Sequence, residues 1–246
     1  MVFGAMTLLW VLPWLVVARR LPSYDRAGRE APVPVRRILR EPALWAMGLV
    51  HFTGTYCLYF AVTWFPLYLV QSEGFDLKRM TFIASLGFLA QGVSAIGLGL
   101  LSDWWTRSGR DEGTIRRWTM IVAQTVLAGA IVALLTARGE AQLIAWMMVI
   151  GATNASGGVN LYAVAQMFAG PRASGTFVGI QNATGNLSGI VGPVLTGMII
   201  DATGRYDNAF FVTAAVALVG ALAWGLLVPS IRPINFDDPD VLPAEL

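Results

Sequence analysis

The sequence predicts an all-α integral membrane protein, and three features indicate this class. Hydrophobic residues make up 56% of the 246 residues and charged residues only 13%, whereas soluble domains usually carry about 25% charged residues. The charges lie between long apolar runs that contain none. Most of these runs are about 20 residues or longer, the length that a membrane-spanning helix needs. So few charges could barely cover a water-facing surface, which argues against a soluble domain.

The first apolar run, residues 2–17, is short for a spanning helix. At 1.5 Å per residue it extends about 24 Å, against a hydrocarbon core of about 30 Å. It lacks the basic n-region and small-residue cleavage site of a signal peptide, and Arg19 and Arg20 follow it directly. We therefore interpret residues 1–17 as the end of a longer helix, so that the chain would be the C-terminal part of a larger protein. Residues 18–42 form a linker rich in proline and arginine.

Six further runs follow the linker, and short loops between them make consecutive helices antiparallel. The predicted spans are residues 43–70, 80–101, 118–137, 141–168, 173–200 and 208–228. Together they form a bundle over residues 43–229, and the polar, proline-bearing tail 230–246 is expected to be disordered. Six helices behind a long basic linker are typical of one half of a twelve-helix transporter.

The loops differ in charge, which predicts the orientation of the chain. Thirteen of the seventeen basic residues fall on one side: Arg19, Arg20, Arg26, Arg29, Arg36, Arg37, Arg40, Arg107, Arg110, Arg116, Arg117, Arg172 and Arg232. Cytoplasmic loops carry an excess of Lys and Arg. The linker, the turn after Asp103 and the C-terminus are therefore expected in the cytoplasm.

Polar side chains inside the spans are the candidate functional residues, because they are costly in hydrocarbon and usually face a bundle interior or a wet cavity. Eight amides lie within the spans: Gln91, Gln124, Asn154, Asn160, Gln166, Gln181, Asn182 and Asn186. Six of the eight belong to residues 141–168 and 173–200. These two spans are therefore expected to line a cavity, whereas 118–137 and 208–228 should face lipid.

Within residues 173–200, one helix face carries Gly175, Gly179, Asn182, Asn186, Gly189 and Pro193 at spacings of three and four. Asn182 and Asn186 could contact a solute or could simply join helices by hydrogen bonds. In the preceding span, the stretch from Asn154 to Asn160 contains glycines that could open the helix backbone to a solute, or could allow tight packing.

Residues 43–70 place Tyr56, Tyr59 and Thr63 on one face. Their hydroxyls suit carboxylate or sugar partners, with aromatic packing as the alternative. His51, the only histidine, is interpreted as structural rather than as a proton relay.

Several chemistries are excluded. No acid lies inside a span, so a proton-coupling acid is expected in another part of the protein. The single cysteine, Cys57, allows neither a disulfide nor a cysteine metal site. No metal-ligand cluster, Ser/His/Asp set or phosphate-binding loop is present. We therefore expect no enzyme activity, no cofactor, no metal and no nucleic-acid partner.

The turn between residues 97 and 117 carries a recognisable motif. Gly99-Leu100-Leu101-Ser102-Asp103, followed by Arg107, Gly109 and Arg110, resembles the G-x-L-[AS]-D-[RK]-x-G-R-[RK] loop of the major facilitator superfamily. Trp104 departs from it, because a basic residue should follow the acid. The stretch 63–69 (TWFPLYL) and residues 170–176, with GIQNATGNLSGIVGP and DATGRYDNAF behind them, resemble the anion:cation symporter branch.

This resemblance implies a fold, a function and a set of site residues. The fold would be the six-helix C-terminal half of a twelve-helix major facilitator carrier, preceded by the truncated end of helix 6. The function would be symport of organic anions, such as sugar acids or other carboxylates, with protons across a bacterial inner membrane by alternating access. The implied partners are the lipid bilayer and the N-terminal half of the carrier. The implied solute-contact residues are Tyr56, Tyr59, Gln91, Asn154, Asn160, Asn182 and Asn186.

The resemblance also implies a gate formed by Asp103, Arg107 and Arg110. Asp103 would close the cytoplasmic side by pairing with arginines and with a helix N-terminus of the other half. Two alternatives remain at this stage. A seven-helix receptor or photoreceptor fits the number of spans, although residues 208–228 lack the lysine that a retinal protein needs. A half-length transporter that dimerises would also fit.

Overall fold

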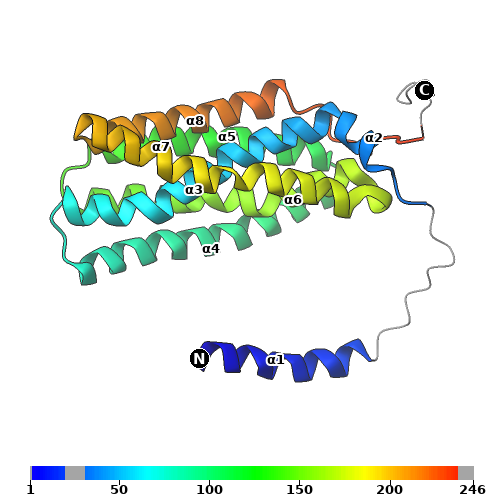
Figure 1. Ribbon diagram of the computed structural model, residues 1–246, viewed down its shortest axis with the longest axis horizontal. Helices are drawn as coiled ribbons and strands as arrows, with labels where there is room; N and C mark the ends of the chain where they lie inside the picture. Colours follow the sequence, from blue (N-terminus) through cyan, green and yellow to red (C-terminus); the bar gives the residue numbers. More distant parts are fainter. Residues whose placement is uncertain (1, 20–30, 238–246) are drawn as a thin grey trace. The chain divides into compact units, whose positions relative to one another are not determined.

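The computed structural model describes residues 2–19 and 31–237, which contain eight α-helices and no strand (Figure 1). The chain divides into two compact units, residues 1–31 and 32–246, and each is described by itself. The first unit contains α1 (Val2–Ala18), a 17-residue helix with Pro13 in its interior. Its large apolar side chains, such as Leu8 and Trp10, are exposed.

The second unit is a bundle of long helices. It consists of α2 (Val35–Arg40), α3 (Pro42–Gln71), α4 (Leu77–Arg107), α5 (Glu112–Leu134), α6 (Glu140–Asn186), α7 (Ser188–Thr203) and α8 (Tyr206–Leu226). Two of the long helices begin at an aspartate cap. Asp76 accepts a 2.7 Å hydrogen bond from the Arg79 backbone N–H, and Asp111 accepts one of 2.7 Å from the Thr114 N–H.

The 47-residue α6 is two helices joined at Gly170. Gly170 has φ 61° and ψ 180°, a left-handed backbone conformation that glycine adopts without steric cost. Pro171 follows, lacks an N–H and is favourable as a first helical residue. α6 therefore has a first segment, residues 140–169, and a second segment, residues 171–186. Leu187 keeps helical angles (φ −56°, ψ −26°), so α7 continues the second segment.

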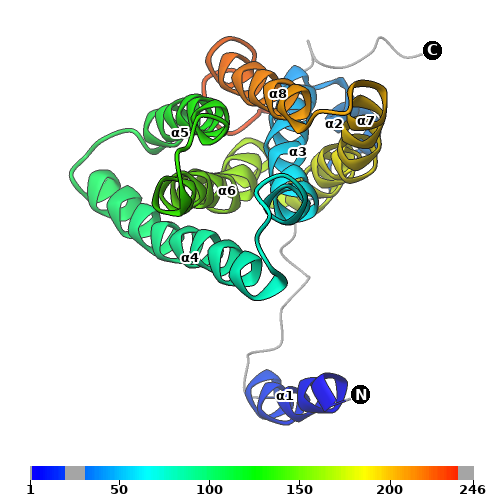
Figure 2. The same cartoon turned by 90° about the vertical axis from the view of Figure 1, so that its left-hand side faces the viewer.

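The first segment of α6 lies at the centre of the bundle, against α3, α4 and α5, while α8 packs on α3 and α5. In the end-on view, α4 lies at one edge (Figure 2). The α4–α6 crossing is very close, because a Cβ added at Gly151 would lie 2.0 Å from the carbonyl oxygen of Gly87. Small residues allow membrane helices to approach to this distance.

The core has two clusters along the bundle. One, toward α2, includes Met47, Phe168 and Trp224. The other, toward the opposite end, is built around aromatic rings, with Phe210 centred 5.0 Å from Phe60 and 5.4 Å from Phe65. These rings join α3 to α8.

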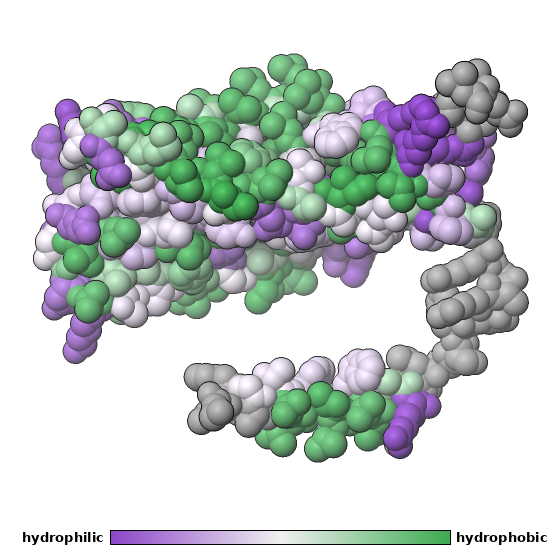
Figure 3. Space-filling view, in the orientation of Figure 1, coloured by the Kyte–Doolittle hydropathy of each residue, from purple (hydrophilic) through white to green (hydrophobic). Residues whose placement is uncertain are grey.

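The outer surface of the bundle suits a bilayer. Hydrophobic side chains spread along its length, and hydrophilic ones gather at its two ends (Figure 3). Among the described residues, four helical stretches are long and apolar enough to cross a membrane: Leu77–Arg107, Glu112–Leu134, Glu140–Thr203 and Tyr206–Leu226. The third has 64 residues and includes the break at Gly170. α3 is 30 residues long and packs against α4, α6, α7 and α8.

The C-terminal segment corrects the expectation of a disordered tail. Residues 229–237 lie across the α2 end of the bundle, with Ile231 and Phe236 buried. The Ile234 N–H donates to the Phe168 carbonyl at 2.8 Å, and Arg172 pairs with Asp237 at 2.6 Å. The apolar residues among the prolines were the signal for this packing. Residues 238–246, like residues 20–30 of the linker, lie outside the described residues.

The described part of the linker is also partly folded. Residues 35–40 form α2, which buries Ile38 completely. Arg37 donates a hydrogen bond to the Phe236 carbonyl. The linker and the C-terminal segment therefore meet at this end of the bundle.

Candidate functional site

Four polar residues from three helical segments form a continuous hydrogen-bonded cluster, here called the Tyr–Asn cluster. Tyr59 on α3 donates to Asn186 Oδ1 at 2.9 Å. Tyr162 on the first segment of α6 donates to Asn182 Oδ1 at 2.8 Å. Asn186 Nδ2 donates to the same Asn182 oxygen at 2.8 Å. The cluster therefore joins α3 to both segments of α6.

The cluster retains capacity to bind a polar solute. Tyr162 is 39% exposed, and Tyr59, Asn182 and Asn186 are partly exposed. Within the described chain, the Asn182 side-chain NH₂ has no hydrogen-bond partner, and each tyrosine oxygen can still accept a bond. Such groups can bind hydroxyls and carboxylates. Tyr162 was not singled out from the sequence, although it lies beside Asn160.

Two glycines allow α3 to approach the helix that carries the asparagines. A Cβ at Gly189 would lie 2.9 Å from the Tyr59 ring, and one at Gly185 would lie 2.4 Å from the His51 ring. A Cβ added at Gly175 or Gly179, on the same face as the two asparagines, would meet nothing within 4 Å. Close packing on this face is therefore confined to its α7 side, and its other half is open in this chain.

His51 and Thr55 lie next to the Tyr–Asn cluster on α3. The His51 ring is 2% exposed and meets the Tyr162 ring edge-on at 5.6 Å. Its Nδ1 has no hydrogen-bond partner among the described residues. Thr55 shares a 2.8 Å hydrogen bond with Ser188 and donates to the Gly185 carbonyl at 2.9 Å. Tyr59 and His51 are thus held on opposite sides of a hydrogen-bonded contact between α3 and α7.

Tyr56 does not join the cluster. Its side chain is 1% exposed, and its ring lies over Gly192, where an added Cβ would be 3.4 Å from the ring. A residue buried in this way serves packing between α3 and α7. Its neighbour Tyr59 has the more accessible hydroxyl of the two predicted tyrosines.

Gln91 and Asn154 come together, but at a different place. Both line a cavity of about 90 Å³ between α3, α4 and the first segment of α6. Gly87 and Gly151, which form the close helix crossing, line the same cavity. The backbone between Asn154 and Asn160 stays helical throughout, so the helix is not opened there. Gly157 and Gly158 do not bring a neighbouring helix close either, because an added Cβ would meet only Leu161 of the same helix or nothing within 4 Å.

Asn160 faces α5 instead. It is buried, its Oδ1 accepts a 3.0 Å bond from Arg116, and its Nδ2 donates to the Ser156 carbonyl. Arg116 also pairs with Glu112 at 2.7 Å. Arg116 was assigned to a loop from the sequence, but it lies within α5, where its long side chain reaches Asn160.

The three predicted gate residues are exposed near the C-terminal end of α4. Asp103 lies within the helix, one turn before it ends at Arg107, and pairs with no cation of the described chain. The Arg110 guanidinium lies 5.9 Å from the centre of the Trp105 ring. These residues therefore form no network with one another. In addition, the described residues contain no group of His, Cys, Asp and Glu side chains that could hold a metal ion.

Comparison with protein families decides the class. The family model for the Major Facilitator Superfamily matches residues 1–111 and 112–240, which is nearly the whole chain. The chain belongs to the Major Facilitator Superfamily. It is accordingly a multi-pass integral membrane protein of a transporter family, and not an enzyme.

Its superfamily relatives include transporters named for organic anions. The chain is 32% identical over 188 residues to the probable galactarate/D-glucarate transporter of Escherichia coli, covering 75% of this chain and 41% of that protein. It is 30% identical to the probable sulfoacetate transporter of Cupriavidus necator, covering 90% and 50%. It is 25% identical to the hexuronate transporter of Bacillus subtilis, covering 92% and 56%. The chain spans about half the length of these curated relatives.

Proposed function

We propose that this chain is the C-terminal portion of a secondary active transporter that moves organic anions, such as sugar acids or other carboxylates, by alternating access. The observation that carries the proposal is the Tyr–Asn cluster, which presents hydrogen-bonding groups at an open face of a membrane bundle. The names of the three relatives support the solute class, because they all describe organic acids that carry a carboxylate or a sulfonate.

The other half of the solute site is supplied by an N-terminal six-helix half. Two observations support this. The match covers 41% of the length of the galactarate/D-glucarate transporter, and the helix face at Gly175 and Gly179 has no close neighbour in this chain. An anion also needs a cation, and no Lys or Arg of the described chain hydrogen-bonds to the cluster. The compensating charge and the proton-coupling acid therefore lie in the N-terminal half. α1 is the end of its last helix.

The proposed membrane is a bacterial inner membrane, with the α2 end and the C-terminus in the cytoplasm. The excess of arginine in the loops at that end supports this orientation. In this arrangement Asp103, Arg107 and Arg110 lie on the cytoplasmic side. They act as a gate in which Asp103 takes its partner from the N-terminal half, and this explains why Asp103 has no pair within the described chain.

Uptake into proteoliposomes tests the proposal on the full-length protein. Galactarate, a hexuronate and sulfoacetate are the substrates, with a neutral hexose and an amine as comparison solutes. Asn186→Ala removes the bridge between Tyr59 and Asn182 and should weaken solute affinity about tenfold, the effect of one or two lost hydrogen bonds. Asn208→Ala is the matched control, because Asn208 is exposed at the start of α8 and outside the cluster. Uptake confined to the neutral or cationic solute would refute the anion assignment.

A further inference from the structure

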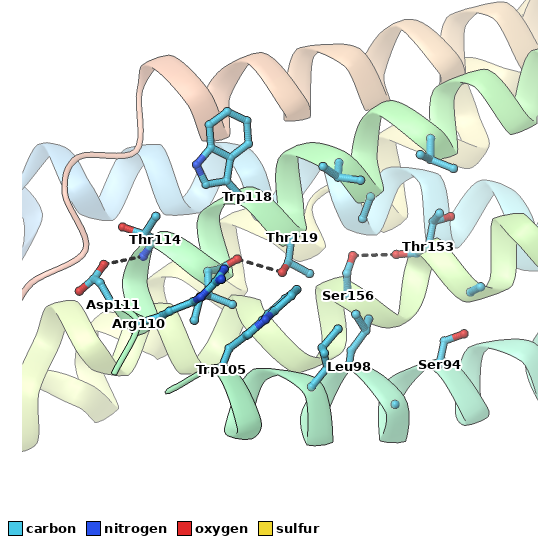
Figure 4. Close-up of a pocket in the computed structure, with 17 residues that line it drawn as sticks. Ser94, Leu98, Trp105, Arg110, Asp111, Thr114, Trp118, Thr119, Thr153 and Ser156 are labelled. Carbon is cyan, nitrogen blue, oxygen red and sulfur yellow. Dashed lines mark hydrogen bonds between the residues drawn. The ribbon is translucent and has the colours of Figure 1, made fainter. Parts of the chain in front are cut away.

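A large groove lies away from the Tyr–Asn cluster. It has a volume of about 950 Å³ and lies between α4 and α5, with the first segment of α6 as its floor (Figure 4). Its walls are mostly apolar, with Leu98 and Leu101 on α4 and Val122 and Val126 on α5. None of the solute-contact residues predicted from the sequence lines it.

Three of the polar residues along the groove already have hydrogen-bond partners. The hydroxyls of Thr119, Thr153 and Ser156 donate to carbonyl oxygens of their own helices at 2.7–3.0 Å. Two of these bonds are drawn in Figure 4. The groove therefore offers little to a sugar acid, which needs polar partners, and much to a hydrocarbon chain.

One end of the groove differs in chemistry from the rest. Trp105 and Arg110 lie together there, beside the loop between α4 and α5, and Trp118 also lines the groove but points away from them (Figure 4). The Arg110 guanidinium stacks near the Trp105 ring at 5.9 Å and pairs with no acid of the described chain. Tryptophan and arginine are the residues that gather at the headgroup level of a membrane.

Asp111 is the carboxylate among the described residues that line the groove, and it caps the N-terminus of α5. Its Oδ2 accepts the Thr114 backbone N–H at 2.7 Å, and the Thr114 hydrogen bonds lower the pKa of the carboxyl below its ordinary value. The negative charge is thus compensated by the N-terminus of α5. Arg110 remains as the cation available to a ligand.

We propose that this groove is a binding site for a glycerophospholipid. One acyl chain lies along Leu98, Val122 and Val126, and the phosphate pairs with Arg110 beside Trp105. Arginine binds phosphate by charge-assisted and often bidentate hydrogen bonds. Val122 and Trp118 are 55% and 60% exposed on a membrane-spanning helix, so an apolar partner must cover them. A phospholipid matches both the apolar groove and the cation at its end.

Native mass spectrometry of the full-length protein in detergent tests the site. Phosphatidylglycerol is added, and diacylglycerol serves as the probe that has the chains but lacks the phosphate. Arg110→Gln should weaken phosphatidylglycerol binding about tenfold, the worth of a charge-assisted pair, and leave diacylglycerol binding unchanged. Arg107→Gln is the matched control, because Arg107 is also exposed at the end of α4 but does not line the groove.

A second pair of variants tests the apolar part. Gly97→Trp places a large side chain in the groove, where an added Cβ would meet nothing within 4 Å. It should abolish binding of both lipids, whereas Gly92→Trp, on the same helix and equally open but outside the groove, should not. Equal lipid binding by Gly97→Trp and the unsubstituted protein would overturn the proposal.

The competing occupant is another part of the same transporter. A fluorophore attached at Val122→Cys, with Cys57 replaced, distinguishes the two in vesicles of brominated phospholipid. Quenching that Gly97→Trp reduces supports a lipid in the groove. An absence of quenching would show that protein covers Val122 and would overturn the lipid assignment.

Discussion

The close crossing of α4 and the first segment of α6 gives the sharpest stability prediction. In Gly151→Ala the new Cβ would lie 2.0 Å from the Gly87 carbonyl oxygen, 2.8 Å from its carbon and 3.2 Å from its Cα. These are backbone atoms, so no side-chain rotation relieves the overlap. Ordinary contact needs more than 3.4 Å, and α4 must therefore move away from α6 by more than an ångström. We expect a loss near the upper end of the range for overpacking, about 3 kcal/mol.

Thermal unfolding in detergent measures this loss. The thiol of Cys57 is buried and is the only one in the sequence, so a thiol-reactive dye reports unfolding of the bundle. Gly151→Ala should unfold at a clearly lower temperature than the unsubstituted protein. Gly92→Ala, which meets nothing within 4 Å on α4, should be unchanged or stabilised by roughly 0.5–1 kcal/mol through helix propensity. Equal unfolding temperatures for the two variants would refute the crossing as described.

Four further predictions follow from the site and the proposed function. Tyr162→Phe keeps the ring on His51 but removes the bond to Asn182, so solute affinity in an uptake assay should fall several-fold with no change in unfolding temperature; equal affinity would exclude Tyr162 from the site. Asp103→Asn should lower the turnover of uptake with little change in solute affinity, and a large affinity loss with normal turnover would assign Asp103 to binding instead. Arg172 lowers the pKa of Asp237 below the ordinary 3.8. The bond between Arg172 and Asp237 is therefore fully present above pH 3.8 and is lost as the pH falls through the lowered pKa of Asp237. Hydrogen exchange of residues 231–237 should then become faster in acid. Exchange that does not depend on pH, after correction for its intrinsic rate, would contradict this. Finally, residues 1–246 expressed alone should show no uptake, and uptake by a crosslinked dimer would favour a self-sufficient half-transporter.

The fold class was predictable from the sequence because charge and hydropathy act locally. Runs without charges predict membrane helices, and the superfamily assignment made from the Asp103 motif is confirmed by the family match. Helix ends were less predictable. α4 extends from Leu77 to Arg107, beyond the charge-free run at both ends, since exposed charged residues continue a helix as readily as apolar ones. The break at Gly170–Pro171 and the cap at Asp111 have clear local signals.

The candidate site was predictable in composition but not in grouping. Gln166 is exposed, and the structure distributes the amides predicted as solute contacts among three places: Asn182 and Asn186 with Tyr59, Gln91 with Asn154, and Asn160 with Arg116. Which groups meet depends on the rotation of each helix and on the approach distances set by Gly151, Gly185 and Gly189. Those distances arise from tertiary packing, which a single sequence does not display.

The hydrogen bond between Ile234 and Phe168 has a consequence for biogenesis. Gly170 and Pro171 end the first segment of α6, and the Phe168 carbonyl receives its partner from a residue 66 positions later. During synthesis the Phe168 carbonyl therefore has no such partner until residue 234 has left the ribosome. A chain ending at residue 228 should accumulate as a protease-sensitive species, whereas one ending at residue 237 should mature normally. Equal protease resistance of the two would show that the end of α6 folds without its late partner.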